Sequence, residues 1–329
     1  MVRTRSIAVG QGDREQEEAL VRDTVVGNSP APHASEPVAT ALPLDTTVGH
    51  LIRRAQQMHT AIWSVEVGND ITSPQYAILS ALSRKSGVDQ QTAGRLASLD
   101  KSTTANIVER LERKDWIRRD RDAGDGRRNQ LWLTPSAKAM LHDLTARVEA
   151  VQDRLLQPLG PNLRRSFRKL LGRVAYAGPV PTAGQDADEG IDVLPLSSAA
   201  GHLIRRAEQV HGMLWSRHVG TLLTPSQYAL LCSLAWRPAI DQTAAGEMAS
   251  LDKSSAADIL ARLRRRGWVL DTRDETDRRR KLLVLTDLAR DTLAEVTPAV
   301  QAVQRDLVAP LSPAERDKVI SLLRRVAYR

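Results

Sequence analysis

The sequence predicts a mainly α-helical protein with small β hairpins, built from two copies of one domain. The first observation is an internal repeat, because LDKSTTANIVERLERKDWIRRDRDAGDGRRNQLWLT at 99–134 returns as LDKSSAADILARLRRRGWVLDTRDETDRRRKLLVLT at 251–286. The second is the helical spacing of apolar residues at the start of each stretch, and the third is a pair of β-prone runs around a charged tip. The flanking sequences align without a gap, so duplication and fusion is the simplest account.

The stretch 99–134 predicts a helix followed by a hairpin. Ile107 and Leu111 lie one turn apart, which leaves a polar, hydrogen-bonding face on the other side of the helix. The segments 116–117 and 131–133 are β-prone, and the Gly- and Asp-containing tip 122–128 suits a turn between them. A helix followed by a basic two-stranded wing is suited to gripping duplex DNA.

The repeat resembles the MarR family of winged helix-turn-helix transcription factors. The resemblance rests on LDKS followed by Thr or Ser, on the junction RKDW or RRGW, and on the wing pattern D-x-x-D-x-R that ends in L-T; it covers about 44–177 and 196–329. It implies two tandem winged helix-turn-helix domains with long dimerisation helices, forming a pseudo-twofold dimer within one chain. A homodimer of fused chains, in which like copies pair, is the rival arrangement.

The domain limits follow from composition and from the repeat. Residues 1–41 read as a disordered N-terminal extension, 42–176 as the first winged-helix domain, 177–193 as a linker rich in Gly, Pro and acidic residues, and 194–329 as the second domain. A flexible linker of this kind raises the effective concentration of each half for the other.

Each copy predicts the same order of helices. The long first helices span about 46–67 and 198–219, and the short helices before the recognition helices span about 91–98 and 243–250. Helix starts are marked by a hydroxyl, aspartate or glycine before the first turn, at Ser73-Pro74, Thr224-Pro225, Asp100, Asp252, Thr134-Pro135, Thr286-Asp287, Gly160-Pro161 and Ser312-Pro313. Ser312 and Glu315 also form a capping box, which the first copy lacks.

Charge indicates a polyanionic partner. Residues 101–128 hold nine basic and six acidic side chains and residues 253–280 hold nine and five, so these stretches contribute +3 and +4 to a total charge of +8. An aromatic content of 3% excludes a stacking platform for single strands. The single cysteine, Cys232, excludes an internal disulfide, lies in an apolar run typical of a buried thiol, and fits a cytoplasmic protein without membrane or signal segments.

DNA contacts are expected on the exposed face of each recognition helix and on each wing. In the first copy these residues are Lys101, Ser102, Thr103, Asn106 and Arg110, and in the second Lys253, Ser254, Ser255, Asp258 and Arg262. The resemblance adds a wing arginine oriented by an aspartate, at Arg127 with Asp125 and at Arg279 with Asp277. The alternative for these side chains is a solvated, charged surface.

The two copies differ at positions that would read DNA. Asn106 can bond adenine bidentately, whereas Asp258 only accepts hydrogen bonds. Asp115 replaces the family's customary glycine, which Gly267 keeps, and Gly126 stands where the second wing has arginine. An imperfect palindromic operator in double-stranded DNA is therefore the expected partner. The alternative is that Asp258 is a neutral surface change.

A small aromatic or phenolic effector is a further expected ligand, because the resemblance implies release from DNA by aromatic acids. His59 and Trp63 lie one turn apart on the first helix, as do His211 and Trp215. Arg53 or Arg54, and Arg205 or Arg206 in the second copy, are candidate partners for its carboxylate. The alternative is that these tryptophans and histidines are packed core residues.

An enzyme is not expected. The sequence has no glycine-rich phosphate loop, no metal-ligand spacing and no nucleophile elbow, so no catalytic residue, metal or cofactor is predicted. The sequence thus predicts a DNA-binding regulator, namely a repressor that a ligand releases from DNA. The competing class is a winged-helix module that binds an acidic protein and reads no DNA sequence.

Overall fold

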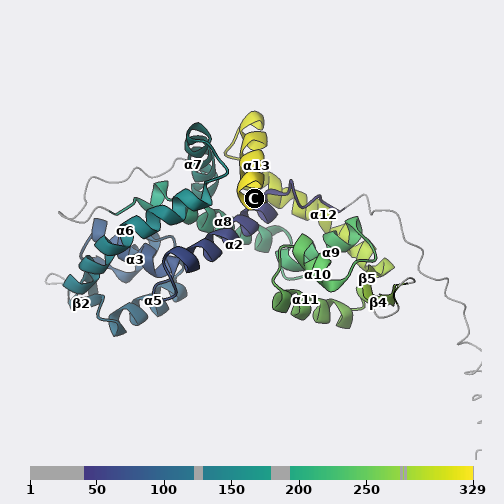
Figure 1. The fold of residues 1–329 in the computed structure, drawn as a ribbon, viewed down its shortest axis with the longest axis horizontal. Coiled ribbons are helices and arrows are strands. Elements are labelled where there is room, and N and C mark those ends of the chain that lie inside the picture. Colours follow the sequence, from purple (N-terminus) through teal and green to yellow (C-terminus); the bar gives the residue numbers. More distant parts are fainter. Residues whose placement is uncertain (1–40, 122–128, 179–192, 275–276, 278–279, 329) are drawn as a thin grey trace, which may run out of the picture. The chain divides into compact units, whose positions relative to one another are not determined.

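The computed structural model describes residues 41–121, 129–178, 193–274, 277 and 280–328. The first copy comprises α2 (Val48–Glu66), α3 (Ser73–Arg84), β1 (Val88–Asp89), α4 (Gln90–Leu96), α5 (Lys101–Arg113), β2 (Ile117–Arg121), β3 (Asn129–Leu133), α6 (Pro135–Leu155) and α7 (Pro161–Tyr176). The second comprises η1 (Leu196–Ser198), α8 (Ala200–His218), α9 (Pro225–Trp236), α10 (Gln242–Met248), α11 (Lys253–Arg265), β4 (Val269–Arg273), β5 (Lys281–Leu285), α12 (Asp287–Leu307) and α13 (Pro313–Ala327). The fold is mainly helical with small antiparallel wings, as predicted (Figure 1). Across these ranges, every helix is too short or too polar to cross a membrane.

Capping side chains fix where most helices start. Asp100 and Asp252 cap α5 and α11, and Ser312 forms the expected capping box on α13, while Gly160 caps α7 without a side-chain bond. One predicted cap was wrong, because Thr72 rather than Ser73 caps α3.

The Thr72 cap shows why the sequence pattern misled. The Thr72 hydroxyl accepts from the Gln75 N–H at 3.4 Å, and the Gln75 side chain accepts from the Thr72 N–H at 2.9 Å. A cap at Ser73 would place Tyr76 at the third helical position, and Tyr76 has no carbonyl or carboxylate that could complete the exchange. Pro74 consequently occupies the second helical position.

The wings are antiparallel pairs that differ between the copies. Strands β2 and β3 pair with Ile117 opposite Leu133, and the two-residue strand β1 adds to the free edge of β3. Strands β4 and β5 form the second wing, where the place of β1 is taken by a single bridge from Ile240 to Leu283. Strand β1 was not predicted, because two residues carry no period-2 signal.

The apolar core forms two clusters, and the larger one takes residues from both copies. Helix α2 packs on α8 and α13, and α7 packs on α8 and α13 (Figure 1). Leu51 and Ile52 of α2 are fully buried, together with Leu203 and Ile204 of α8 and with Leu323 of α13. The first and last helices of each copy therefore bury their apolar faces against the other copy.

The residues that lead into each copy pack on the opposite copy. Leu44 lies in the apolar cluster of the second copy, and η1 contacts α3 of the first. Ala41, the last residue assigned to the N-terminal extension, is 3% exposed, and its carbonyl accepts a hydrogen bond from Trp236 Nε1 at 3.1 Å. Below, the first lobe is α3–α5 with β1–β3, and the second lobe is α9–α11 with β4 and β5.

Candidate DNA interface and buried inter-copy sites

Helix α5 separates a buried face from a polar, exposed one. Thr104, Ile107 and Leu111 are buried against the first lobe. Of the residues expected to contact DNA, Thr103 is half-buried and the rest are exposed, namely Lys101, Ser102, Asn106 and Arg110. These residues thus share one accessible face, and their contact with DNA stays a prediction.

The start of α5 is held by a hydrogen-bonded cap. The Thr103 and Ser102 hydroxyls donate to the Asp100 carboxylate at 2.6 and 2.7 Å, and the Thr103 N–H donates at 2.8 Å. These bonds, the Thr103 hydroxyl first, hold the pKa of the Asp100 carboxyl well below its usual range. Because both hydroxyl protons are already used, their oxygens remain as acceptors, which suits base amino groups better than phosphates.

Helix α11 repeats this arrangement with a different surface. Ser255 donates its hydroxyl to Asp252 at 2.6 Å, and this bond lowers the pKa of the Asp252 carboxyl. Ser255 is half-buried, and the other expected contact residues are exposed, namely Lys253, Ser254, Asp258 and Arg262. An exposed carboxylate thus occupies the position at which the first copy has an amide.

An ion pair links each recognition helix to its wing, with the charges exchanged between copies. Glu112 of α5 accepts from Arg119 of β2 at 2.6 Å. Arg264 of α11, at the position of Glu112, donates to Asp271 of β4 at 2.7 Å. Of the predicted wing contacts, Asp277 is exposed, whereas the other three lie outside the described residues, namely Asp125, Arg127 and Arg279.

The aromatic residues proposed for an effector lie in the core near the inter-copy contact. Trp63 is 5.9 Å from the His59 ring and 5.7 Å from the Tyr76 ring, measured between centroids. In the second copy, Trp215 is 5.8 Å from the rings of both His211 and Tyr228. Each indole N–H donates to a backbone carbonyl, which fixes the orientation of the ring.

Each of these histidines reaches the first helix of the other copy. A Cβ atom added to Gly49 would lie 2.2 Å from His211 Nε2, and one added to Gly201 would lie 2.2 Å from His59 Nε2. Only a residue without a side chain leaves room for the imidazole at these two positions.

Two arginines connect the first helix of one copy to the lobe of the other. Arg53 donates to the carbonyls of Ala249 and Ser250 at 2.5 and 3.2 Å, and Arg205 donates to those of Ala97 and Ser98 at 2.8 and 3.0 Å. The two serines have φ values of 53° and 54°, and they lie in the turns just before the caps of the recognition helices. Movement of either arginine would therefore break hydrogen bonds to the turn that precedes a recognition helix.

The surroundings of these arginines form two equivalent buried sites. The Arg53 site consists of Arg53, His50, His211, Trp215 and Tyr228. These residues line a cavity of about 20 Å³, which has room for about one water molecule. The Arg205 site consists of the repeat-equivalent residues, in which the roles of the two copies are exchanged, namely Arg205, His202, His59, Trp63 and Tyr76.

The histidines of both sites are neutral at physiological pH. Burial lowers the pKa of His50 and His202 to about 3 and that of His59 and His211 to about 4, and neighbouring arginines add to the effect. Each neutral ring can donate from one nitrogen and accept at the other. His50 Nδ1 and His202 Nδ1 each lie 3.0 Å from the guanidinium of the neighbouring site arginine.

Sequence reasoning did not single out several residues of these sites, namely His50, His202, Tyr76, Tyr228, Ser98 and Ser250. All six recur at matching positions of the two copies, and that repetition was the available signal. Arg54 and Arg206 were named only as alternatives to Arg53 and Arg205, and they stack on Tyr328 and Tyr176 at 4.2 Å.

Catalytic and metal chemistry has little support in the described part of the chain. No group of three His, Cys, Asp or Glu side chains is arranged there to hold a metal ion. Burial raises the pKa of the Cys232 thiol to about 12, so it is protonated and unreactive at neutral pH.

Comparison with known proteins gives consistent matches in both halves. One MarR family model matches residues 69–128, and a second MarR family model matches residues 223–281. The chain is 32% identical to the transcriptional regulator HosA of Escherichia coli over 125 residues, which are 38% of this chain and 92% of HosA. It is 34% identical to the HTH-type transcriptional repressor NicR of Pseudomonas putida over 110 residues, 31% of this chain and 70% of NicR.

Solved structures also match. The crystal structure of the PcaV transcriptional regulator from Streptomyces coelicolor in complex with its natural ligand is 41% identical, with a TM-score of 0.41; the match covers 42% of this chain and 97% of PcaV. The transcriptional repressor CouR, bound to a 23-mer DNA duplex, is 29% identical with a TM-score of 0.37, over 41% of this chain and 96% of CouR.

Two recognition helices on wing-bearing lobes, joined through shared first and last helices, define a tandem winged helix-turn-helix protein. The chain belongs to the MarR family, with two family domains in tandem. It is a DNA-binding transcriptional regulator and not an enzyme.

Proposed function

We propose that the chain is a repressor that binds an imperfect palindromic operator with its two lobes and leaves it when a small aromatic acid enters a buried inter-copy site. The observation that carries this proposal is the bond from Arg53 or Arg205 to the turn before the opposite recognition helix. An anion that engages either guanidinium competes directly with that turn.

The exposed faces of α5 and α11 supply the readout. Asn106 offers an amide to adenine, and Asp258 offers a carboxylate to the amino group of cytosine. Lys101 and Lys253, at the helix starts, are placed for phosphates, and the wing residues at Arg127 and Arg279 are assigned to the minor groove. Positive charge near both helices steers the duplex towards this face.

The buried sites suit an aromatic carboxylate chemically. The arginine fork binds a carboxylate bidentately, and neutral histidine and tyrosine side chains can bond a phenolic hydroxyl. Trp63 and Trp215 supply apolar walls. Because the Arg53 cavity has room for only about one water molecule, a ligand enters only if the site opens, and the arginine then gives up its carbonyl partners.

The experiment measures DNA affinity with and without aromatic acids. A labelled duplex selected by the protein from a random pool is titrated by fluorescence anisotropy at one salt concentration, because affinity depends strongly on salt. Benzoate and 4-hydroxybenzoate are the probes, and acetate is the control for ionic effects. We expect the probes to raise the Kd by about 5- to 150-fold, the usual range for coupled sites.

Two outcomes would contradict the proposal. Equal affinity for selected and random duplexes would indicate a protein-interaction module without sequence readout. Equal effects of acetate and the aromatic acids would mean that the anions act as salt and that neither buried site binds a ligand.

A further inference from the structure

The Arg53 and Arg205 sites hold their recognition helices with different numbers of hydrogen bonds. Besides Arg53, the turn at Ser250 is bonded by Gln57, whose Nε2 donates to the Ser250 carbonyl at 2.7 Å, and by Arg54, whose Nη1 donates to the Ser250 hydroxyl at 2.8 Å. The equivalent residues facing Ser98 are Gln209 and Arg206. Neither makes the corresponding bond within the described part of the chain, so the first turn is held by Arg205 and His202, with the Tyr176 hydroxyl close enough to Ser98 to hydrogen-bond it.

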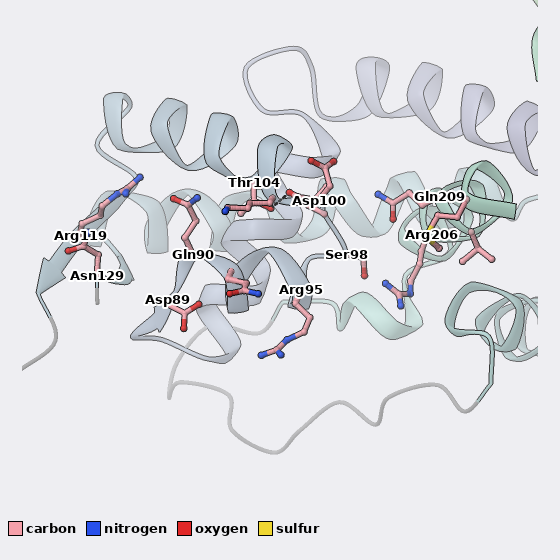
Figure 2. A pocket seen from close by; sticks show the side chains of 15 residues that line it. Asp89, Gln90, Arg95, Ser98, Asp100, Thr104, Arg119, Asn129, Arg206 and Gln209 are labelled. Atoms are coloured by element: carbon pink, nitrogen blue, oxygen red, sulfur yellow. Dashed lines mark hydrogen bonds between the residues drawn. The ribbon is translucent and has the colours of Figure 1, made fainter. Parts of the chain in front are cut away.

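Arg206 and Gln209, which make no bond to the Ser98 turn, line an open concavity instead. Arg206 and Gln209 lie beside Ser98 in the wall of a concavity of about 1110 Å³ that also includes Lys101 (Figure 2). Ser98 and Ser250 are equally buried, at 6% exposed, and the concavity is reached beside the Ser98 turn, along Arg206 and Gln209. The equivalent approach to Ser250 is crossed by the bonds from Arg54 and Gln57.

The charge around the two arginines also differs. Glu208, on α8, lies near enough to Arg53 for each to shift the pKa of the other, although burial is the larger cause for both. The equivalent residue opposite Arg205 is Gln56, which is neutral, and no described carboxylate contributes to the pKa of Arg205. Arg205 is 7% exposed, so it is a buried cation that no carboxylate of the described residues neutralises.

The Arg205 site also contains buried polar atoms that lack hydrogen-bond partners among the described residues. Arg205 Nε, His59 Nδ1 and the Tyr76 hydroxyl are buried and have no hydrogen-bond partner within the part of the chain that the structure describes. In the Arg53 site, by contrast, the hydroxyl of Tyr228 is paired with Thr297 Oγ1 at 3.1 Å. Buried polar groups without partners are costly, and a ligand with complementary groups would satisfy them.

We propose that each chain binds one aromatic carboxylate, at the Arg205 site, and that this ligand loosens the recognition helix of the first lobe while the second lobe stays held. The inference rests on the proposed function and adds which site is occupied and which half of the operator responds. The Arg53 site stays closed because Glu208 supplies its anion and because Arg54 and Gln57 secure the Ser250 turn.

Calorimetric titration of the full chain tests the stoichiometry, with benzoate and 4-hydroxybenzoate as probes. We expect one probe per chain. Gln56→Glu, which gives Arg205 an internal carboxylate, should weaken binding at least tenfold, and the matched change Glu208→Gln should leave the first site intact and open a second. Tyr76→Phe should weaken only the hydroxylated probe, and Tyr228→Phe should weaken neither.

Hydrogen exchange gives a readout specific to each lobe. Residues 98–102 and 250–254 have the same sequence, SLDKS, so their intrinsic exchange rates are nearly equal and differences report structure. We expect 98–102 to exchange faster in the free protein and faster still with the probe. Gln57→Ala should accelerate exchange in 250–254, whereas Gln209→Ala should change neither segment.

The outcomes separate the inference from the proposed function. Two equal sites per chain, binding that is lost in Glu208→Gln, or equal exchange in the two segments would overturn the inference and leave an aromatic-acid regulator in place. Absence of binding by both probes would overturn the two together. The control is the melting temperature of Gln56→Glu and Tyr76→Phe. If it is unchanged, their effects on binding come from the site and not from loss of folding.

Discussion

At the scale of single residues, two glycines decide whether the histidines of one copy fit against the first helix of the other. We expect Gly49→Ala to destabilise the protein by about 1–3 kcal/mol, because the new methyl group would overlap the buried His211 ring. Urea unfolding monitored by circular dichroism measures the change.

Gly212, within α8, is the matched control for that substitution. An added Cβ there meets no atom within 4 Å, so Gly212→Ala should stabilise the helix by up to about 1 kcal/mol. Because alanine has the higher helix propensity, a similar loss of stability in both variants would mean that the overlap with His211 is not the cause of the Gly49 result.

Asp115 shows what a residue-level comparison of the copies reveals. The sequence marked it as a replacement for the glycine retained at Gly267, and both residues adopt left-handed φ values, 55° and 67°. Aspartate is among the few residues that reach this region at moderate cost. The substitution therefore changes the strain of the turn between helix and wing without changing its path.

At the scale of elements, the two recognition helices present an amide and a carboxylate at equivalent exposed positions. We expect Asn106→Ala to cost about 1–3 kcal/mol at one base pair of the first half-site and to relax preference there. Asp258→Asn should make the second helix read like the first. Binding to three duplexes, the native operator and a symmetric operator built from each half, measures both effects at fixed salt.

The hypothesis of unequal half-sites would be abandoned if the native chain bound both symmetric operators as tightly as its own. Selection experiments with the two variants supply an independent check. Asp258→Asn should select a more symmetric sequence than the native chain, and Asn106→Ala should lose one conserved base pair.

The helices and most caps were predictable at this scale because their signals are local. The order of elements in each copy, the caps at Asp100 and Asp252, and the capping box at Ser312 all follow from neighbouring residues. Strand β1 was missed because its pairing partner lies far along the chain. The cap of α3 lies one residue before the predicted Ser73, because the Gln75 side chain completes a capping box with Thr72.

At the scale of the whole molecule, the chain covers its own dimerisation helices. Since α2, α7, α8 and α13 bury their apolar faces against one another within one chain, we expect a single chain in solution, with a mass near 36.2 kDa by light scattering, and one chain on each operator. Twice that mass would indicate a homodimer of fused chains and a longer or doubled operator.

The sequence by itself determined the repeat, the helix and wing pattern, the polar face of each recognition helix and the charge that favours DNA, because each is written in residues close along the chain. Only the tertiary structure decided which copy's arginine holds which copy's turn, why Gly49 and Gly201 must lack a side chain, and how the Arg53 and Arg205 sites differ. Those contacts join residues far apart in sequence, and burial, hydrogen bonding and unpaired charge exist only once the two copies pack together.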